Sequence, residues 1–138
     1  TYKEKKKLYL FDTFEGLPAL SDIDRSLFHE GQYGARIDDV RQYLRDYANV
    51  SLHKGLFPDT AGLIKDKKFS FVHLDVDTYE STKSSIEFFY PRMSRGGVIL
   101  SHDYINSPGV RKAVDDFMVD KPEPVFESSW RQCMIVKV

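Results

Sequence analysis

Two aspartates separated by one residue, Asp75 and Asp77, stand between the apolar run FSFVHL and the polar stretch TYESTKSS. Carboxylates placed directly after a strand support two different chemistries. One can act as the nucleophile of a phosphatase while the other acts as the acid. Alternatively, one can hold a divalent cation while the other takes a proton from the substrate. The local pattern leaves both chemistries open.

A second polar pair, His102 and Asp103, follows the apolar run VILS, and Asp12 follows the run LYLF. With Asp75, this pair offers two carboxylates and one imidazole. Carboxylate oxygens suit Mg²⁺, Mn²⁺ or Ca²⁺, and a histidine ligand shifts the preference toward a transition-metal ion. Each residue also has a structural interpretation, because aspartates close turns or cap helices and histidines at strand ends are often hydrogen-bonded core residues. Acidic clusters after separate strands nevertheless favour a functional site.

The polar pairs lie in a chain whose apolar runs alternate between strand-like and helix-like patterns. Strands are expected at 8–14, 49–55, 68–75, 98–103, 124–128 and 131–138, and helices at 37–47, 59–66, 78–93 and 107–120. Such alternation is typical of βα units, so the sequence predicts an α/β fold with a mostly parallel sheet and an antiparallel pair of C-terminal strands. Ligands of such sheets bind outside the carboxyl ends of the strands, which is where all the polar residues named above fall. We therefore expect them to line one site.

Several details of these elements are expected from local patterns. The helix at 37–47 should bury one face, which consists of Val40, Tyr43, Leu44 and Tyr47. Asp59 should cap the short helix that it begins, and the strand at 68–75 should be buried. The sequence SRGG, residues 94–97, should end the preceding helix.

Composition limits the classes of partner. The chain has 138 residues, enough for a single domain, 1–138, with its own core. Its 20 basic and 21 acidic residues nearly cancel, so we expect neither a nucleic-acid nor a membrane partner. No apolar run reaches the ~18 residues of a membrane span, and a lone Cys133 fits a reducing compartment, which predicts a cytoplasmic protein. The lysine-rich run 3–7 is interpreted as a solvated lead-in to the first strand. The predicted partner is a small molecule, and a homo-oligomer is compatible with the sequence.

Three stretches resemble the macrocin O-methyltransferase family, whose metal-dependent members methylate hydroxyls of antibiotic sugars with S-adenosylmethionine. They are FDTFEGLP (11–18), LDVDTYESTKSSIEFFYPRMSRGGVIL (74–100) and HDYINSPGVRKAVDDF (102–117). Between the first two, GQYGARIDDVRQYL (31–44) and HKGLFPDT (53–60) fall in matching order. The similarity covers nearly the whole chain, and its middle block is long and specific.

The resemblance implies a Rossmann-like methyltransferase sheet and assigns a role to each candidate. Asp12 would bind the ribose hydroxyls of S-adenosylmethionine, while Gly55 and Leu56 would border its adenine. Asp75 and Asp103 would hold Mg²⁺ or another divalent cation, and Asp75 would also lie beside the cofactor. Asp77 would be the general base. The family usually has two aspartates where this chain has His102 and Asp103, so the third metal ligand either becomes an imidazole or is lost.

The resemblance also implies a first strand and a Gly-rich loop that should precede residue 1, with that strand central in the sheet. We therefore expect an N-terminally truncated enzyme, or a chain that has lost cofactor affinity. Without that strand, LYLFD (8–12) should pair with FVHLD (71–75), or a strand from elsewhere should fill the gap. A missing strand rebuilt by residues 1–7 would contradict the expected truncation or loss of cofactor affinity.

Two other functions compete with the methyltransferase. A phosphatase of the haloacid-dehalogenase type would use Asp75 as nucleophile and Asp77 as acid, although its motif usually begins a domain and here lies mid-chain. A degenerate methyltransferase-like domain would serve as a binding module without catalysis. The acceptor hydroxyl cannot be read from the sequence, because specificity lies in loops, here a lid expected at 19–36.

Overall fold

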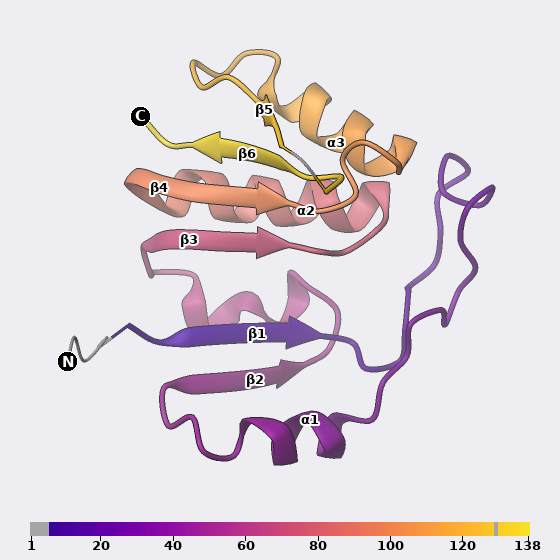
Figure 1. Cartoon of the computed structure of the whole chain (residues 1–138), viewed down its shortest axis with the longest axis vertical. Coiled ribbons are helices and arrows are strands. Elements are labelled where there is room, and N and C mark those ends of the chain that lie inside the picture. Colours follow the sequence, from indigo (N-terminus) through magenta and orange to yellow (C-terminus); the bar gives the residue numbers. More distant parts are fainter. Residues whose placement is uncertain (1–5, 129) are drawn as a thin grey trace.

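A computed structural model describes residues 6–128 and 130–138 and shows an α/β fold (Figure 1). The strands are β1 (Leu8–Asp12), β2 (Val50–Lys54), β3 (Phe69–Leu74), β4 (Met93–Ser101), β5 (Phe126–Glu127) and β6 (Cys133–Val136). The α-helices are α1 (Ile37–Leu44), α2 (Tyr79–Phe89) and α3 (Pro108–Met118), and the 3₁₀ helices are η1 (Asp59–Ile64) and η2 (Tyr90–Arg92). Every expected element is present in the expected order. No helix in the described ranges is long and apolar enough to cross a membrane.

The strands form two sheets. β1 and β2 pair in parallel, with Leu8 opposite Val50 and Asp12 opposite Lys54. The second sheet has the order β3-β4-β6-β5, in which β3 and β4 are parallel and β6 is antiparallel to both β4 and β5. Two of these four strand pairings are parallel and two, at the C-terminal end, are antiparallel, which confirms an α/β fold with parallel pairing and an antiparallel C-terminal pair.

The expected pairing of residues 8–12 with residues 71–75 is wrong. β1 and β3 point the same way in Figure 1, but no ladder joins them, and each is an edge strand among the described residues. A strand rebuilt by residues 1–7 would have contradicted the expected loss of the first strand. Residues 6 and 7 form no strand, and residues 1–5, which include residues 3–5 of the lysine-rich run, lie outside the described part of the chain. The local apolar pattern specifies two strands but carries no information on their partners.

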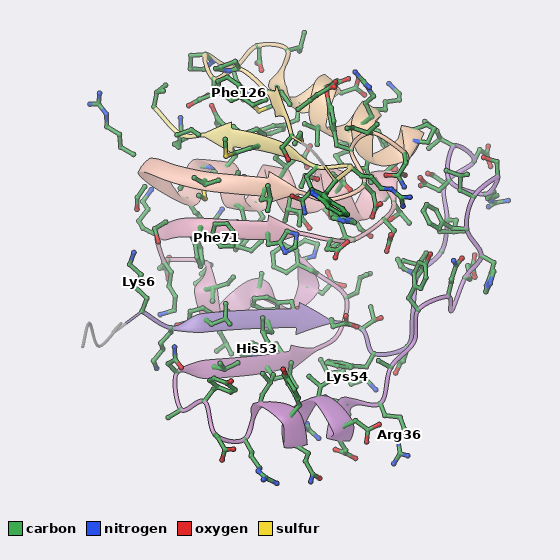
Figure 2. The ribbon with its side chains drawn as sticks, in the orientation of Figure 1. Lys6, Arg36, His53, Lys54, Phe71 and Phe126 are labelled. Atoms are coloured by element: carbon green, nitrogen blue, oxygen red, sulfur yellow. The ribbon has the colours of Figure 1, made fainter. Side chains whose placement is uncertain are left out.

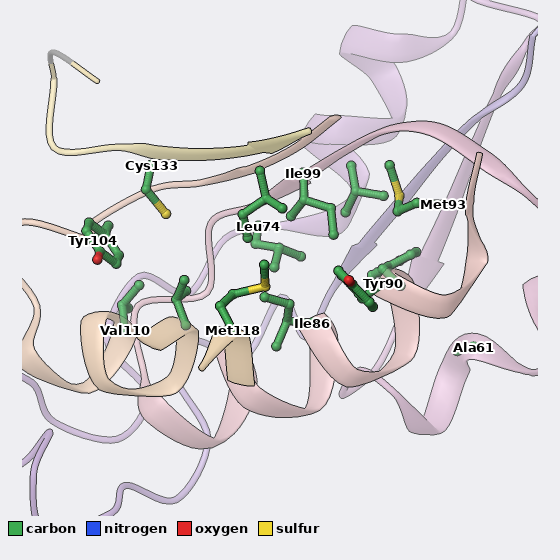
Figure 3. Close-up of a cluster of buried hydrophobic side chains, with 14 of the residues drawn as sticks. Ala61, Leu74, Ile86, Tyr90, Met93, Ile99, Tyr104, Val110, Met118 and Cys133 are labelled. Atoms are coloured by element: carbon green, nitrogen blue, oxygen red, sulfur yellow. The ribbon is translucent and has the colours of Figure 1, made fainter. Parts of the chain in front are cut away.

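The core lies between the four-stranded sheet and the helices α2 and α3, which pack against each other on one face of it (Figure 3). Ile86 and Val114 are fully buried, and Leu74 and Ile99 contribute from β3 and β4. The helix patterns predicted these buried faces, because apolar residues three and four positions apart share one side of a helix. This layer fixes the carboxyl ends of β3 and β4 relative to the starts of α2 and α3.

Strand β3 is buried on one face only, which corrects the expected buried strand. Val72 and Leu74 face the helices, whereas Phe71, labelled in Figure 2, is 56% exposed. The break expected at SRGG is also wrong. Residues 94–97 belong to β4, where Gly96 has φ 75° and the register with β3 shifts between Phe69 and Phe71. The helix ends earlier, at η2, which contains Pro91.

Two smaller expectations on helices are wrong as well. Helix α1 ends at Leu44 and has no buried residue, and Tyr43 and Tyr47 are 79% and 56% exposed. The half-buried residues of α1 are Ile37, Val40 and Leu44, whose i, i+3, i+7 spacing places one narrow stripe on β2. The side chain of Asp59 does not cap η1, which Pro58 precedes.

A buried polar cluster closes the C-terminal end of the fold. Glu123 is 3% exposed and accepts hydrogen bonds from Lys137 Nζ at 2.5 Å, from the backbone N–H of Val138 at 3.2 Å and from the Tyr90 hydroxyl. Burial alone would raise the pKa of the Glu123 carboxyl, but the hydrogen bonds from Lys137 and Tyr90 outweigh it and lower the pKa to about 2. The ionised carboxylate therefore stabilises the fold.

We expect Glu123→Gln to lower the free energy of unfolding at pH 7 by about 2 kcal/mol, because its three donors lose a charged acceptor. The folded pKa of about 2 lies below the ordinary value of 4.5, so this stabilisation is present above pH 4.5 and is lost as the pH falls toward 2. Urea unfolding of both proteins at neutral and acidic pH measures the difference. A gap between them that stays constant with pH would contradict the assignment.

Candidate functional site

One cleft at the carboxyl ends of the strands collects the residues that the sequence singled out. Its volume is about 520 Å³, within the range of ligand sites, which is roughly 300–1,000 Å³. The predicted residues that line it are Asp12, Gly55, Leu56, Asp75, Asp77, His102 and Asp103. Their expected convergence on one edge is therefore confirmed, although their chemical roles remain predictions. The cleft spans the ends of both sheets, so it does not depend on a ladder between β1 and β3.

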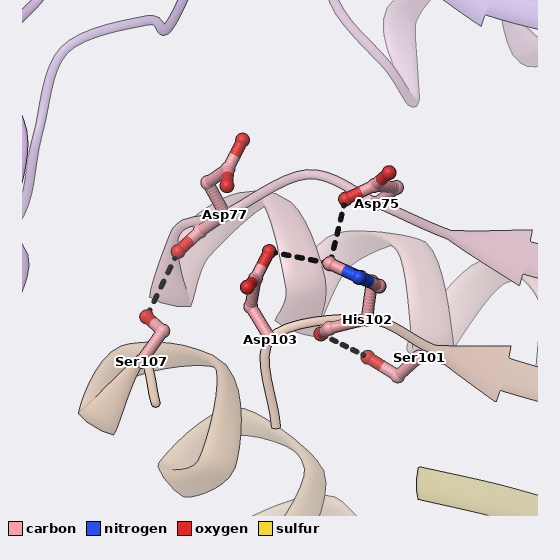
Figure 4. Close-up of polar contacts among 6 residues, drawn as sticks. All are labelled: Asp75, Asp77, Ser101, His102, Asp103 and Ser107. Carbon is pink, nitrogen blue, oxygen red and sulfur yellow. Dashed lines mark hydrogen bonds and ion pairs between the residues drawn. The ribbon is translucent and has the colours of Figure 1, made fainter. Parts of the chain in front are cut away.

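The side chains of Asp75, His102 and Asp103 meet at the ends of β3 and β4 (Figure 4). His102 Nδ1 lies 2.8 Å from Asp103 Oδ2 and 3.4 Å from Asp75 Oδ1. One potential ligand atom from each residue lies within 4.8 Å of the others. The hydrogen bond to Asp103, reinforced by the nearby carboxylate charges, raises the pKa of His102 above its ordinary value. Two carboxylates and one imidazole at this spacing fit a divalent cation.

Asp77 lies beside this cluster, at the start of the segment that leads into α2. Its φ of 60° is unusual for a residue other than glycine, and Asp103 has a similar φ of 56°. The Ser107 hydroxyl donates to the Asp77 carbonyl at 3.0 Å, which ties this turn to α3. Burial and the negative charges of Asp103 and Asp75 raise the pKa of the Asp77 carboxyl to about 6. A carboxylate with this pKa is a good proton acceptor near neutral pH.

The opposite end of the cleft is formed by the ends of β1 and β2. Asp12 is exposed, and its Oδ1 accepts a hydrogen bond from the Phe14 N–H at 2.6 Å, so it does close a turn as well as line the cleft. The Gly55 N–H donates to the Asp12 carbonyl at 2.9 Å. Gly55 has φ 138°, and a Cβ there would lie 2.6 Å from the Thr60 side chain, so glycine is required. Leu56, next in the chain, is 43% exposed.

The segment 13–36 between β1 and α1 forms the outer wall of the cleft. Phe28, Gln32 and Tyr33 line it, all within the lid expected at 19–36. The segment is closed on itself by backbone hydrogen bonds from Leu17 to Gln32 at 2.8 Å and from Gly31 to Leu17 at 2.9 Å. That this polar connection would border the site was foreseeable, and its role as a lid stays a prediction. The lining residues were not foreseeable, because no periodicity marks them.

Arg131 also lines the cleft and was missed by the sequence interpretation. It lies between β5 and β6, where both Trp130 and Arg131 have φ 69°. Among the described residues its guanidinium has no hydrogen-bond or ion-pair partner. Neither residue is a typical turn former, so the sequence carried no signal that this segment returns to the site.

Comparisons with known proteins point to one family. The sequence model of the family described as Macrocin-O-methyltransferase (TylF) matches residues 2–129. A curated relative from Streptomyces olivaceus, 8-demethyl-8-(2,3-dimethoxy-alpha-L-rhamnosyl)-tetracenomycin-C 4'-O-methyltransferase, is 29% identical over 123 residues, which cover 81% of this chain and 47% of that protein. Demethyldecarbamoylnovobiocin O-methyltransferase from Streptomyces niveus is 27% identical with the same coverage.

Two solved structures share the fold. The O-methyltransferase NovP superposes with a TM-score of 0.87 at 22% identity, covering 99% of this chain and 62% of NovP. The calicheamicin methyltransferase CalS11 superposes with a TM-score of 0.76 at 20% identity, covering 94% of this chain and 60% of CalS11. This chain spans about half the length of the curated relatives it matches. With the family model matching most of its residues, the chain belongs to the macrocin O-methyltransferase family.

Proposed function

We propose that this chain carries the acceptor-activating site of an S-adenosylmethionine-dependent O-methyltransferase that acts on a hydroxyl of a sugar or related small molecule. The observation that carries the proposal is the cleft in which Asp12 and the cluster Asp75, Asp77, His102 and Asp103 face one another. The names of the relatives, which refer to a rhamnosyl tetracenomycin and to a novobiocin precursor, support a sugar or natural-product acceptor. We expect the protein to work in the cytoplasm, on small molecules rather than on nucleic acid or membranes.

Asp75, His102 and Asp103 would hold a divalent cation such as Mg²⁺. Their donor atoms are close enough for one ion, and two of the three are the carboxylates that Mg²⁺ prefers. A bound cation would supply positive charge that lowers the pKa of an acceptor hydroxyl. Asp75 is 54% exposed at its side chain, so it faces both this position and the open cleft.

Asp77 would take the proton of the acceptor hydroxyl. Its carboxyl lies in the same cleft, and its raised pKa suits a base that must accept a proton near neutral pH. S-adenosylmethionine supplies a methyl group already activated by the sulfonium. The acceptor oxygen, deprotonated by Asp77, would bond to that methyl carbon, and the electron pair of the broken carbon–sulfur bond would stay on sulfur. The proton remains on Asp77, and the net charge balances.

Asp12, Gly55 and Leu56 would hold the nucleoside end of the cofactor. An acidic residue at a strand end is well suited to the two hydroxyls of a ribose. Leu56 is 43% exposed and lines the cleft, so an adenine ring would pack against its side chain. In this proposal the cofactor would lie across the ends of β1 and β2, and the acceptor would lie nearer β3 and β4.

Asp12→Asn should weaken binding of S-adenosylhomocysteine by about tenfold, because a charged acceptor of ribose hydrogen bonds becomes a neutral one. The asparagine can still accept from Phe14, so the turn is preserved. Calorimetric titration of the product cofactor measures the loss. Asp22→Asn, a change at an exposed carboxylate on the outer segment, is the matched control and should bind as the unaltered chain does.

Calorimetric titration of S-adenosylhomocysteine into this chain, with and without Mg²⁺, tests the proposal as a whole. Binding that is about tenfold weaker in Asp12→Asn, together with methyl transfer to members of a panel of sugar hydroxyls, would support it. The absence of a ladder between β1 and β3 favours a second candidate, a methyltransferase-like binding module without catalysis. That candidate predicts no cofactor binding with or without Mg²⁺. Membership of the methyltransferase family argues against the phosphatase, which would hydrolyse a generic phosphate ester.

A further inference from the structure

Asp24 is a buried carboxylate that the proposed chemistry does not use. It lies in the segment 13–36, is 1% exposed and does not line the cleft. Its backbone organises a tight turn, because its N–H donates to Ser21 and its carbonyl accepts from Leu27 at 3.0 Å and from Phe28 at 3.1 Å. A charged side chain this deeply buried in a connecting segment is unusual and needs partners.

One oxygen of Asp24 caps a helix distant in the sequence. Oδ2 accepts hydrogen bonds from the Tyr79 N–H at 3.0 Å and from the Ser21 hydroxyl at 2.6 Å. Tyr79 is the first residue of α2, and the local N-cap residue, Thr78, makes no capping hydrogen bond with its own side chain. Asp24 therefore satisfies a free N–H at the start of α2 and places negative charge where the helix dipole favours it.

The other oxygen of Asp24 packs against a second helix start. Oδ1 is buried and has no hydrogen-bond partner among the described residues. It abuts Gly109 in the first turn of α3, where a Cβ would overlap it and would also lie 3.1 Å from the Tyr79 nitrogen. Gly109 has no unusual φ, so the need for glycine is steric and arises from the carboxylate. Asp24 and Gly109 form a matched pair.

The two helices that Asp24 contacts, α2 and α3, also fix the position of Asp77. Tyr79 follows Asp77 by two residues, and Ser107, two residues before Gly109, donates to the Asp77 carbonyl. On the other side, the turn that Asp24 heads ends at Phe28, which lines the cleft. A single buried carboxylate thus joins the outer wall of the cleft to the segment that carries the base.

We propose that Asp24 is a positioning residue that latches the segment 13–36 onto the starts of α2 and α3 and so holds the outer wall, with Phe28 and Tyr33, against the acidic cluster. The latch itself follows from the contacts of Asp24 alone. Its consequence for the acceptor rests on the proposed function. The tests therefore separate docking of the segment from events at the site.

Amide hydrogen exchange in the full chain tests the docking. Asp24→Ala should speed exchange of the Leu27, Phe28 and Tyr79 amides by at least about tenfold. The hydrogen bonds that protect these three amides should break together when the segment 13–36 detaches. Amides of Ile99 and Ile135 in the core strands should keep their protection, which shows that the fold persists. Asp22→Asn, which alters an exposed carboxylate two residues away, should leave these exchange rates unchanged. Unchanged exchange at all three amides in Asp24→Ala would overturn the latch.

Gly109→Ala disturbs the same contact between Asp24 and Gly109 by adding a methyl group at residue 109, and it leaves the Asp24 side chain unchanged. Alanine is the better helix residue, so without the carboxylate it should be neutral or favourable in α3. In the native background it should release the segment as Asp24→Ala does, whereas in the Asp24→Ala background it should add less than about twofold to the exchange rates. Equal effects in both backgrounds would show that the two residues do not act through one contact. Asp24→Asn, which can still accept from Tyr79, should give an intermediate rate.

Broadening of proton resonances by Mn²⁺ tests the consequence at the site. Mn²⁺ held by the acidic cluster should broaden the ring signals of Phe28 and Tyr33 in the native chain. Asp24→Ala should reduce this broadening while leaving Mn²⁺ affinity unchanged, a result that a purely local cap would not give. Equal broadening in both proteins would overturn the positioning role. An absence of Mn²⁺ binding in the native chain would instead count against the proposed metal site, and the exchange data would still decide the latch.

Discussion

The substitution Asp77→Asn is expected to reduce methyl transfer by about 10²–10⁴-fold, the usual loss when a general base is removed. Asparagine is nearly isosteric and tolerates the φ of 60° that this position requires, so the turn into α2 should survive. The Ser107 hydroxyl would still donate to the backbone carbonyl, which the substitution does not touch. The amide cannot take the proton, so the loss should fall on kcat rather than on binding.

Measurements of cation binding distinguish Asp77 as a general base from Asp77 as a metal ligand. Titration of Mg²⁺ and Mn²⁺ should give affinities within about threefold of the native chain in Asp77→Asn, because Asp77 lies outside the cluster of donor atoms. Asp22→Asn serves as the control for loss of one negative charge. If Asp77→Asn abolished metal binding and turnover together, Asp77 would be a ligand and the division of roles between Asp75 and Asp77 would be wrong.

Asp103→Asn is expected to have the second large effect, a loss of divalent-cation affinity of at least about 100-fold. Changes in residues that only support a ligand already cost about 10–100-fold, and Asp103 both contributes a donor atom and orients His102 through the 2.8 Å contact. Asparagine suits the φ of 56° at this position, so the strand end should keep its shape. The substitution should also bring the pKa of Asp77 down toward its ordinary value, because the Asp103 charge is one of the causes that raise it.

Calorimetric titration with Mn²⁺ measures the affinity, and methyl transfer at saturating Mn²⁺ measures what activity remains. His102→Gln is the informative companion, because it removes the imidazole but leaves both carboxylates. A loss in His102→Gln comparable to that in Asp103→Asn would support the imidazole as the third ligand. Unchanged cation affinity in Asp103→Asn would sink the proposed metal site.

The convergence of the acidic residues on one cleft was predictable because it follows from the order and direction of the strands. Each of the clusters follows an apolar run, and the carboxyl ends of parallel strands meet at one edge whatever the detailed packing. The buried faces of α2 and α3 were predictable for the same kind of reason, since a period of 3.6 residues places Ile86 or Val114 on one side regardless of context.

Predictions from local patterns were wrong where the outcome depends on the neighbouring element that the segment packs against. SRGG looks like a helix terminator, but the helix already ends at η2, and the glycines fit a strand whose register with β3 shifts. Tyr43 and Tyr47 match a helical period, yet α1 contacts only a narrow β2 surface and leaves both exposed. Apolar periodicity states which side chains could be buried, and the size of the partner surface decides which ones are.

By itself, the sequence determined the α/β order of elements, the family and the strand-end carboxylates, because these follow from local periodicity and from long matching segments. Only the tertiary structure decided that β1 and β3 do not pair with each other, that Arg131 reaches the cleft and that Asp24 caps α2 across 55 positions of chain. The physical reason is that hydrogen bonds and close packing between distant segments depend on distances that no local pattern encodes. Asp24 and Gly109 are unremarkable in the sequence, and their dependence on each other exists only where two helix starts meet.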